Sequence, residues 1–198
     1  GSKVTVLEGA KALGKDDPEL AAIALEKLRG EGIEIVEGAL ASEIKGQAGA
    51  IEVHTKDGAV YSGSHLLMAV GRTPNVDKLD LEKAGIEYDR GGLKVDDSLR
   101  TTNKKVYGIG DVAGPLQFTH VAGYHAGIVV RQIVLGLPAK AKQSHIPWAT
   151  YTDPEIAQVG MTEAAARDAH GDKLTVVRFP YHENDRAIAE VWINGVRQ

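Results

Sequence analysis

Two acidic residues of this 198-residue sequence stand where strand-like runs end. Glu8 follows the β-branched run Lys3–Leu7, and Asp111 follows the run Val106–Gly110. A carboxylate at the end of the second strand of a dinucleotide-binding fold can accept hydrogen bonds from both ribose hydroxyls of an adenosine, and its charge repels the 2′-phosphate of NADP. If Lys3–Leu7 is that second strand, Glu8 predicts a contact to NAD rather than NADP. The alternative for Glu8 is a solvated glutamate at a strand end.

Asp111 directly follows Gly110, and Gly108 lies three residues before it. Because these glycines have no side chain, a ligand can approach the backbone closely. This position predicts that Asp111 accepts hydrogen bonds from ligand hydroxyls, with a helix N-cap role as the alternative. A helix is predicted to follow, and the backbone N–H groups near Thr119 and His120 would present the positive end of its dipole to a ligand. Packing is the alternative role for His120.

The sequence contains no cysteine, which excludes disulfides, thiolate nucleophiles and cysteine metal ligands from these residues. Its seven histidines form no H-E-x-x-H pattern, and only His120 and His125 lie near helical spacing. No carboxylate lies beside this pair in the sequence to complete a metal site. We therefore predict no metal site in this chain.

The composition is that of a globular protein, with 43% hydrophobic and 25% charged residues. A net charge of −4 and a pI of about 6.0 give no general attraction to nucleic acid or acidic membranes. Apolar runs stay well short of the ~20 residues that span a bilayer. We therefore predict a cytoplasmic protein whose partners include neither nucleic acid nor membrane.

The first part of the chain has the pattern of a strand, a helix and a second strand. Lys3–Leu7 and Ile33–Val36 are the predicted strands, and a helix is predicted to begin at Asp16-Asp17-Pro18-Glu19 and to end near Gly30 or Gly32. Such a unit is a right-handed crossover by default. Next, Ile51–His54 and Val60–Ser62 flank Lys56-Asp57-Gly58, which is typical of a hairpin.

Further apolar runs predict the remaining elements. The strands are expected at His65–Val70, Val106–Asp111, Trp148–Tyr151, Ile156–Val159 and Leu174–Phe179, and the helices at Phe118–Leu135 and near Glu163–Ala169.

Two motifs in a fixed order carry a family resemblance. They are Ala69-Val70-Gly71-Arg72-Thr73-Pro74-Asn75 and, preceded by Thr101-Thr102, Val106-Tyr107-Gly108-Ile109-Gly110-Asp111-Val112. With them the chain resembles the pyridine nucleotide-disulfide oxidoreductases, the flavoproteins that include dihydrolipoamide dehydrogenase and mercuric reductase. The resemblance implies that the first motif closes an NAD domain and places Gly71 beside the nicotinamide nucleotide. It also implies that Asp111 binds the ribityl or phosphate region of FAD.

The match continues through Gly114–Ala122, which is similar to the start of the helix whose N-terminus faces the isoalloxazine. Trp148–Glu155 and Val159–Glu163 resemble the entrance to the family's dimer-interface domain, and the likeness ends near residue 190. The resemblance implies an α/β fold: an incomplete NAD-binding Rossmann-like domain (1–71), a partial FAD-binding domain (72–143), the start of an α+β dimerisation domain (144–190) and an unmatched tail (191–198).

FAD and NAD are therefore the expected cofactors, with Glu8, Gly71, Asp111, Thr119 and His120 as the binding residues. The family's G-x-G-x-x-G loops, redox cysteine pair and catalytic His-Glu pair are not found, so we expect a fragment that is inactive alone. The alternative is a non-catalytic nucleotide-binding or interaction module. Arg72 is expected either to contact cofactor or to pair with an acidic neighbour.

The absence of the first Rossmann strand has a structural consequence. That strand would lie beside Lys3–Leu7, and its loss leaves unpaired amides that cost about 1–3 kcal/mol each when buried. The gap must be closed by rearrangement, by a second copy or by another chain, and among these we expect self-association into a homo-oligomer.

Overall fold

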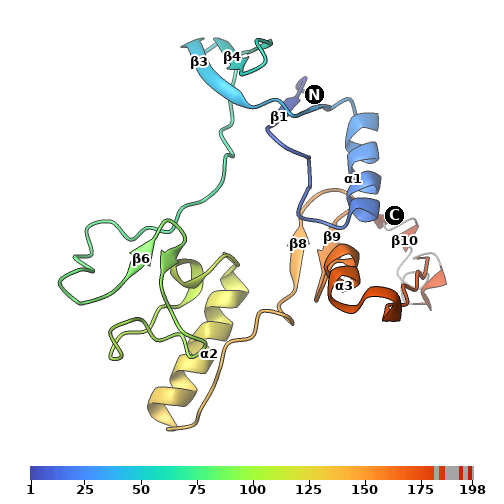
Figure 1. Ribbon diagram of the computed structural model, residues 1–198. Helices are drawn as coiled ribbons and strands as arrows, with labels where there is room; N and C mark the ends of the chain where they lie inside the picture. The colour runs from blue at the N-terminus through green and yellow to red at the C-terminus, as the bar shows by residue number, and fades with distance from the viewer. Residues whose placement is uncertain (181–182, 186–191, 194–195, 198) are drawn as a thin grey trace. The chain divides into compact units, whose positions relative to one another are not determined.

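The computed structural model describes residues 1–180, 183–185, 192–193 and 196–197 (Figure 1). Contacts within the chain divide it into two units. Unit 1 comprises Gly1–Met68 and Pro147–Gln198, and unit 2 comprises Ala69–Ile146. The helices and strands of both units together give the mixed α/β class that the sequence predicts.

The predicted strand, helix and strand at the start of unit 1 are confirmed. β1 (Thr5–Glu8) pairs in parallel with β2 (Glu34–Glu37), which places Glu8 opposite Glu37 at the carboxyl edge. Between them, α1 (Pro18–Gly30) begins after Asp17, whose carboxylate accepts the Glu19 N–H at 3.0 Å. Proline fits the first turn because it lacks the N–H that would have no helical acceptor there.

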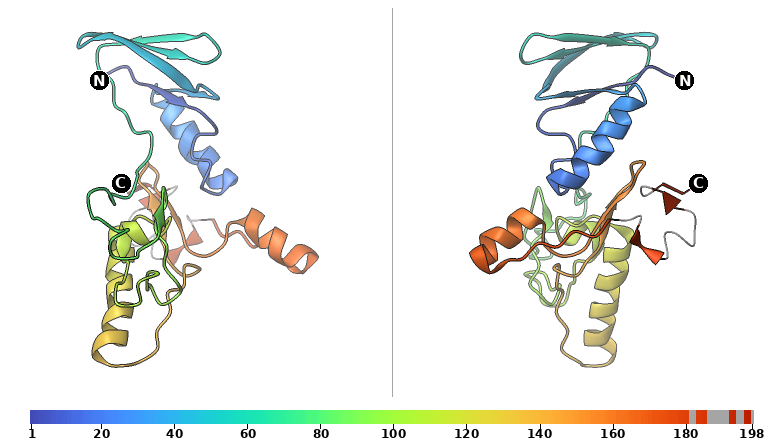
Figure 2. Two further views of the ribbon diagram at one scale, coloured as in Figure 1. Left: turned by 60° about the vertical axis from the view of Figure 1, so that its left-hand side comes forward. Right: turned by 90° about the vertical axis from the view of Figure 1, so that its right-hand side faces the viewer.

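Antiparallel strands follow in unit 1 (Figure 2). β3 (Ala41–Gln47), β4 (Ala50–Thr55) and β5 (Val60–Gly63) form one three-stranded sheet in the order β3-β4-β5. The Thr55 N–H donates to the Ala59 carbonyl at 2.9 Å and closes the last turn. The hairpin predicted around Lys56-Asp57-Gly58 is therefore confirmed.

The C-terminal part of unit 1 begins with an antiparallel pair, β8 (Trp148–Thr150) and β9 (Ile156–Gln158). Then come α3 (Glu163–His170), the 3-10 helix η2 (Gly171–Lys173), and the short pair β10 (Trp192–Ile193) and β11 (Val196–Arg197). The tail predicted at 191–198 lies outside the described residues except for these two strands.

Two side-chain contacts join this C-terminal part to the α1 region of unit 1. The Thr150 hydroxyl donates to both carboxylate oxygens of the buried Asp16, at 3.0 Å each. Arg178 pairs with Glu19 at 2.6 Å and with Glu163 at 3.1 Å. The Thr150–Asp16 and Arg178–Glu19 contacts link residues about 130–160 positions apart in the chain, and local sequence patterns carry no signal for them.

Unit 2 is built around one long helix. α2 (Thr119–Val134) packs against the 3-10 helix η1 (Gly110–Ala113), and η1 in turn packs against β7 (Gly92–Leu93), which pairs with β6 (Tyr88–Asp89). The buried apolar residues of this unit include Leu81, Ile86, Leu99, Ala113, Val121 and Ile128. The predicted helix Phe118–Leu135 is thus confirmed within one residue at each end.

Three predicted strands are not formed in the described residues. His65–Val70 and Leu174–Phe179 have no strand assignment, and Val106–Asp111 is reduced to one bridge between Tyr107 and Arg100. Leu67 and Val70 are 87% and 88% exposed, so the first run covers no core. A strand needs a neighbour for its backbone hydrogen bonds, and no described strand pairs with these runs.

The described residues give β1 a single pairing partner, β2. Val4 and Val6 are 41% and 42% exposed, although such residues are usually buried in a parallel sheet. Among the helices within the described ranges, none is long and apolar enough to cross a membrane.

Candidate functional site

The backbone before Asp111 changes direction sharply. Ile109 is extended, with φ −134° and ψ 152°, and Gly110 then takes a positive φ of +68°, where η1 begins. Asp111 is the second residue of η1, so it caps neither η1, whose N-cap is Ile109, nor α2, whose N-cap is Phe118. The helix N-cap alternative for Asp111 is therefore wrong, and so is its position at the end of a regular strand.

Arg72 binds the carboxylate of Asp111. Its Nη2 donates to Asp111 Oδ2 at 2.8 Å, and its Nη1 donates to the Gln117 carbonyl at 3.2 Å. The expectation that Arg72 pairs with an acidic neighbour is confirmed, and that neighbour is the predicted cofactor ligand. Because the two side chains are 67% and 41% exposed, the ion pair contributes only about 0–1 kcal/mol to stability. The ion pair matters for geometry instead, because Arg72 links Asp111 to Gln117 in the segment that precedes α2.

The N-terminus of α2 has no side-chain cap and no acidic residue in its first turn. The positive end of the helix dipole is therefore not compensated by residues of its own first turn. Thr119 and His120 are the first two residues of α2, as predicted, and the His120 ring stacks on Phe118 with centroids 5.3 Å apart. Packing is thus one role of His120.

His125 lies on the inner face of α2, where sequence reasoning assigned it no role. Its side chain is 5% exposed, and its Nδ1 accepts the Gly110 N–H at 3.2 Å. Burial lowers the pKa of His125 from its ordinary value of 6.5, because the charged ring is disfavoured away from water. The neutral ring is therefore the form that supports the backbone beside Asp111.

Glu8 is in unit 1, where it ends β1 as predicted. Its Oε1 accepts the Ala10 N–H at 2.9 Å, and Glu37, its neighbour on β2, accepts the Ala12 N–H at 2.8 Å. The two carboxylates hold the loop after β1 at the carboxyl edge of the strands. An ionised carboxylate has about four acceptor positions, so one backbone bond leaves Glu8 able to accept ribose hydroxyls.

Gly71 belongs to unit 2 and directly precedes Arg72. Its φ is +112°, a conformation that side chains rarely adopt, and no atom lies within 4 Å of the position of an added Cβ. The backbone at Gly71 is thus open to close approach by a ligand. Gly71, Arg72, Asp111, Thr119 and His120 share unit 2, whereas Glu8 lies in unit 1.

None of these side chains lines the hollow described for unit 2. This hollow, of about 520 Å³, is lined by Asp96, Ser98, Arg100, Lys104, Gln132, Gly136, Leu137, Pro138, Ala139 and Lys140. No group of three or more histidine, aspartate and glutamate side chains suited to a metal ion occurs in the part of the chain that the structure describes.

Comparison with known families gives two matches. The family described as pyridine nucleotide-disulphide oxidoreductase matches residues 1–126. The pyridine nucleotide-disulphide oxidoreductase dimerisation domain matches residues 146–194.

Individual relatives agree. The chain is 32% identical over 204 residues to the dihydrolipoyl dehydrogenase of Bacillus subtilis, covering 98% of this chain and 43% of the relative. It is 34% identical over 201 residues to the mercuric reductase of Bacillus cereus, covering 99% of this chain and 32% of that relative. The chain thus spans less than half the length of these relatives.

Solved structures are also similar. The HOCl-induced flavoprotein disulfide reductase RclA from Escherichia coli matches with a TM-score of 0.83 and 33% identity. That match covers 96% of this chain and 44% of RclA.

Proposed function

Because the chain belongs to the pyridine nucleotide-disulphide oxidoreductase family, we propose that its residues supply FAD and NAD contacts of an NAD(P)H oxidoreductase of the dihydrolipoamide dehydrogenase or mercuric reductase type. The observation that carries the proposal is the arrangement of Asp111 and the N-terminus of α2. A fixed carboxylate and an uncapped helix terminus, linked by Arg72, occur together in unit 2.

These residues fit a flavin. Asp111 would accept hydrogen bonds from ribityl hydroxyls, which are donors, while Arg72 donates to its Oδ2 atom. The backbone at Thr119 and His120 presents the positive end of the α2 dipole, which stabilises negative charge on a reduced flavin ring. When bound, FAD supplies the transfer of electrons between a nicotinamide and an acceptor.

Glu8 and Gly71 fit a nicotinamide nucleotide in their own units. The Glu8 carboxylate ends β1 and keeps acceptor capacity for the ribose hydroxyls, which favours NAD over NADP. Gly71 offers open backbone that a nucleotide can approach. We keep both assignments as proposals alongside those for Asp111, Thr119 and His120.

The whole enzyme would pass hydride equivalents from NADH through FAD to a disulfide, a metal ion or a quinone-like acceptor. The sequence contains no cysteine, so a thiol relay cannot be formed from these residues. We therefore expect the chain to bind nucleotides without reducing a disulfide. Thiol formation from a small disulfide is measured with NADH and FAD, beside the same mixture without protein; thiol formation above that background would contradict the expectation.

The second candidate is a non-catalytic nucleotide-binding or interaction module. The absence of cysteine from the sequence also favours this candidate. FAD binding with no turnover in the isolated chain fits both candidates, whereas turnover restored by adding a cysteine-containing flavin segment of a relative occurs only if the chain is part of an oxidoreductase.

The match to a dimerisation domain supports association between copies of this chain. The single pairing partner of β1 among the described residues gives a physical reason, since its other edge offers free backbone groups. We expect light scattering to give at least twice the mass of one 21.1 kDa chain. A monomer at all concentrations would contradict this. The cytoplasmic location stays a prediction that cell fractionation would test.

A further inference from the structure

We propose that neutral His125 is a positioning residue, which holds Gly110 and thereby sets the orientation of the neighbouring Asp111 toward flavin. The inference rests on the proposed flavin contact of Asp111 and adds to it a residue that touches no cofactor. His125 acts through the Gly110 N–H, which it accepts at 3.2 Å.

The hydrogen bond fixes the protonation state of the ring. Nδ1 can accept from Gly110 only if it carries no proton, so the neutral ring has its proton on Nε2. Protonation of Nδ1 would turn two donors toward each other and break the bond. Because His125 is 5% exposed, water cannot readily replace the lost partner of the Gly110 amide.

Gly110 is also held sterically by the same helix. A Cβ added to Gly110 would lie 3.0 Å from the Cβ of Ala122, and its φ of +68° favours glycine. Ala122 and His125 are three residues apart and therefore lie on one face of α2. The backbone that begins η1 thus rests on α2 with one steric and one polar contact. The backbone conformation at Gly110 therefore sets the direction of the next residue, Asp111.

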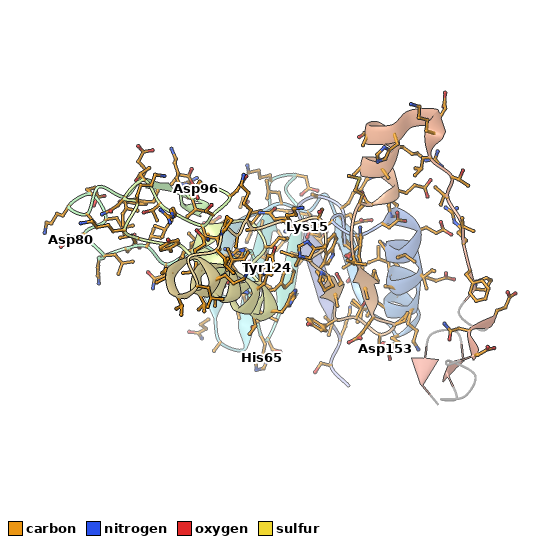
Figure 3. All side chains as sticks on the ribbon, turned by 90° about the horizontal axis from the view of Figure 1, so that it is seen from below. Lys15, His65, Asp80, Asp96, Tyr124 and Asp153 are labelled. Carbon is orange, nitrogen blue, oxygen red and sulfur yellow. The ribbon has the colours of Figure 1, made fainter. Side chains whose placement is uncertain are left out.

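The surroundings of His125 contain several titratable groups. On α2, the Tyr124 ring lies 5.9 Å from the His125 ring, and His120 lies nearer the start of the helix (Figure 3 labels Tyr124). His145 packs edge-on against Tyr124 at 5.2 Å. On η1, Asp111 is paired with Arg72, and β7, which packs against η1, has no titratable side chain.

The pH dependence follows from the lowered pKa of His125. Between pH 6.5 and its own lowered pKa, the folded protein keeps the ring of His125 neutral, whereas the unfolded chain takes up a proton there. Stability contributed by His125 is therefore complete above about pH 6.5 and is lost as the pH falls toward the lower folded-state pKa. We expect FAD affinity also to fall as the pH is lowered, because protonation of His125 releases the Gly110 N–H.

Two substitutions separate positioning from packing. His125→Leu keeps a side chain of similar size but removes the acceptor. We expect this variant to bind FAD about tenfold more weakly at neutral pH. His125→Asn offers an amide oxygen near the position of Nδ1 and cannot be protonated in this range. We expect it to retain most of the FAD affinity and to lose the part of the pH dependence that is due to residue 125. Circular dichroism checks that both variants fold.

The contrary result is FAD affinity of His125→Leu equal to that of the original chain, together with an unchanged pH profile in His125→Asn. A second measurement is independent of flavin: the amide resonance of Gly110 should titrate with the His125 ring, and this titration should vanish in His125→Asn. If FAD does not bind the original chain, the proposed function fails. If the amide resonance of Gly110 does not change as His125 titrates, the positioning role of His125 is wrong.

Discussion

Replacing Asp111 by asparagine is expected to weaken FAD binding by about ten- to a hundredfold. Hydrogen bonds to a charged acceptor contribute about 1.5–3 kcal/mol each, and about 1.4 kcal/mol corresponds to a factor of ten in affinity. Asparagine keeps the size of the side chain but removes the charge and one acceptor oxygen. It also removes the ionic partner of Arg72, whose 2.8 Å bond orients the carboxylate. Quenching of flavin fluorescence on titration with protein gives the affinity.

The matched control is Asp97→Asn, which makes the same chemical change elsewhere in unit 2. Asp97 is exposed and pairs with Lys140 at 3.5 Å, away from η1 and the start of α2. We expect this variant to bind FAD like the original chain. Equal affinities for the Asp111 and Asp97 variants would remove Asp111 from the flavin site.

Replacing Gly92 by alanine is expected to destabilise unit 2 by about 2–4 kcal/mol. Gly92 has a φ of +114°, and an added Cβ would lie 2.3 Å from the carbonyl oxygen of Val112. That oxygen is backbone, so no change of rotamer relieves the clash. Since Val112 follows Asp111 in η1, the substitution must displace either β7 or η1. Hydrogen exchange of the Val121 and Ile128 amides in α2 measures the loss of stability in this unit.

Gly91→Ala provides the comparison for this second variant. At Gly91 the nearest atom to an added Cβ is Asp89 Oδ1, at 3.2 Å, and this side-chain carboxylate can move aside if it gives up the hydrogen bond that it accepts from the Gly91 N–H at 2.7 Å. We expect a loss of about 1 kcal/mol at most, which is smaller than the loss at Gly92. Unaltered exchange in Gly92→Ala would mean that β7 and η1 do not pack as described.

The elements that were predicted correctly depend on local signals. α1 follows from Asp17, Pro18 and the apolar spacing after them, and the hairpin between β4 and β5 follows from its turn residues. The runs His65–Val70 and Leu174–Phe179 have equally strong apolar patterns, yet no described strand pairs with them. A strand is completed by a neighbour that is distant in sequence, and an apolar run says nothing about whether that neighbour is present.

In the candidate site, too, the features with a local sequence signal were predicted and the long-range contacts were not. Asp111 was identified from its motif, and the helix that begins at Thr119 was predicted from periodicity. The partners of Asp111 were not identified, because Arg72 lies 39 residues away in sequence and an ion pair has no local pattern. His125 had no local signal either, because its hydrogen bond with the Gly110 N–H joins residues 15 apart in sequence.

Asp111 and the start of α2 are the proposed flavin contacts. The change in amide resonances of the isotopically labelled chain on addition of FAD tests them. We predict the largest changes at Gly110, Asp111, Thr119 and His120, and their loss in Asp111→Asn. Changes confined to unit 1, or the same changes in Asp111→Asn, would remove Asp111 and α2 from the flavin site.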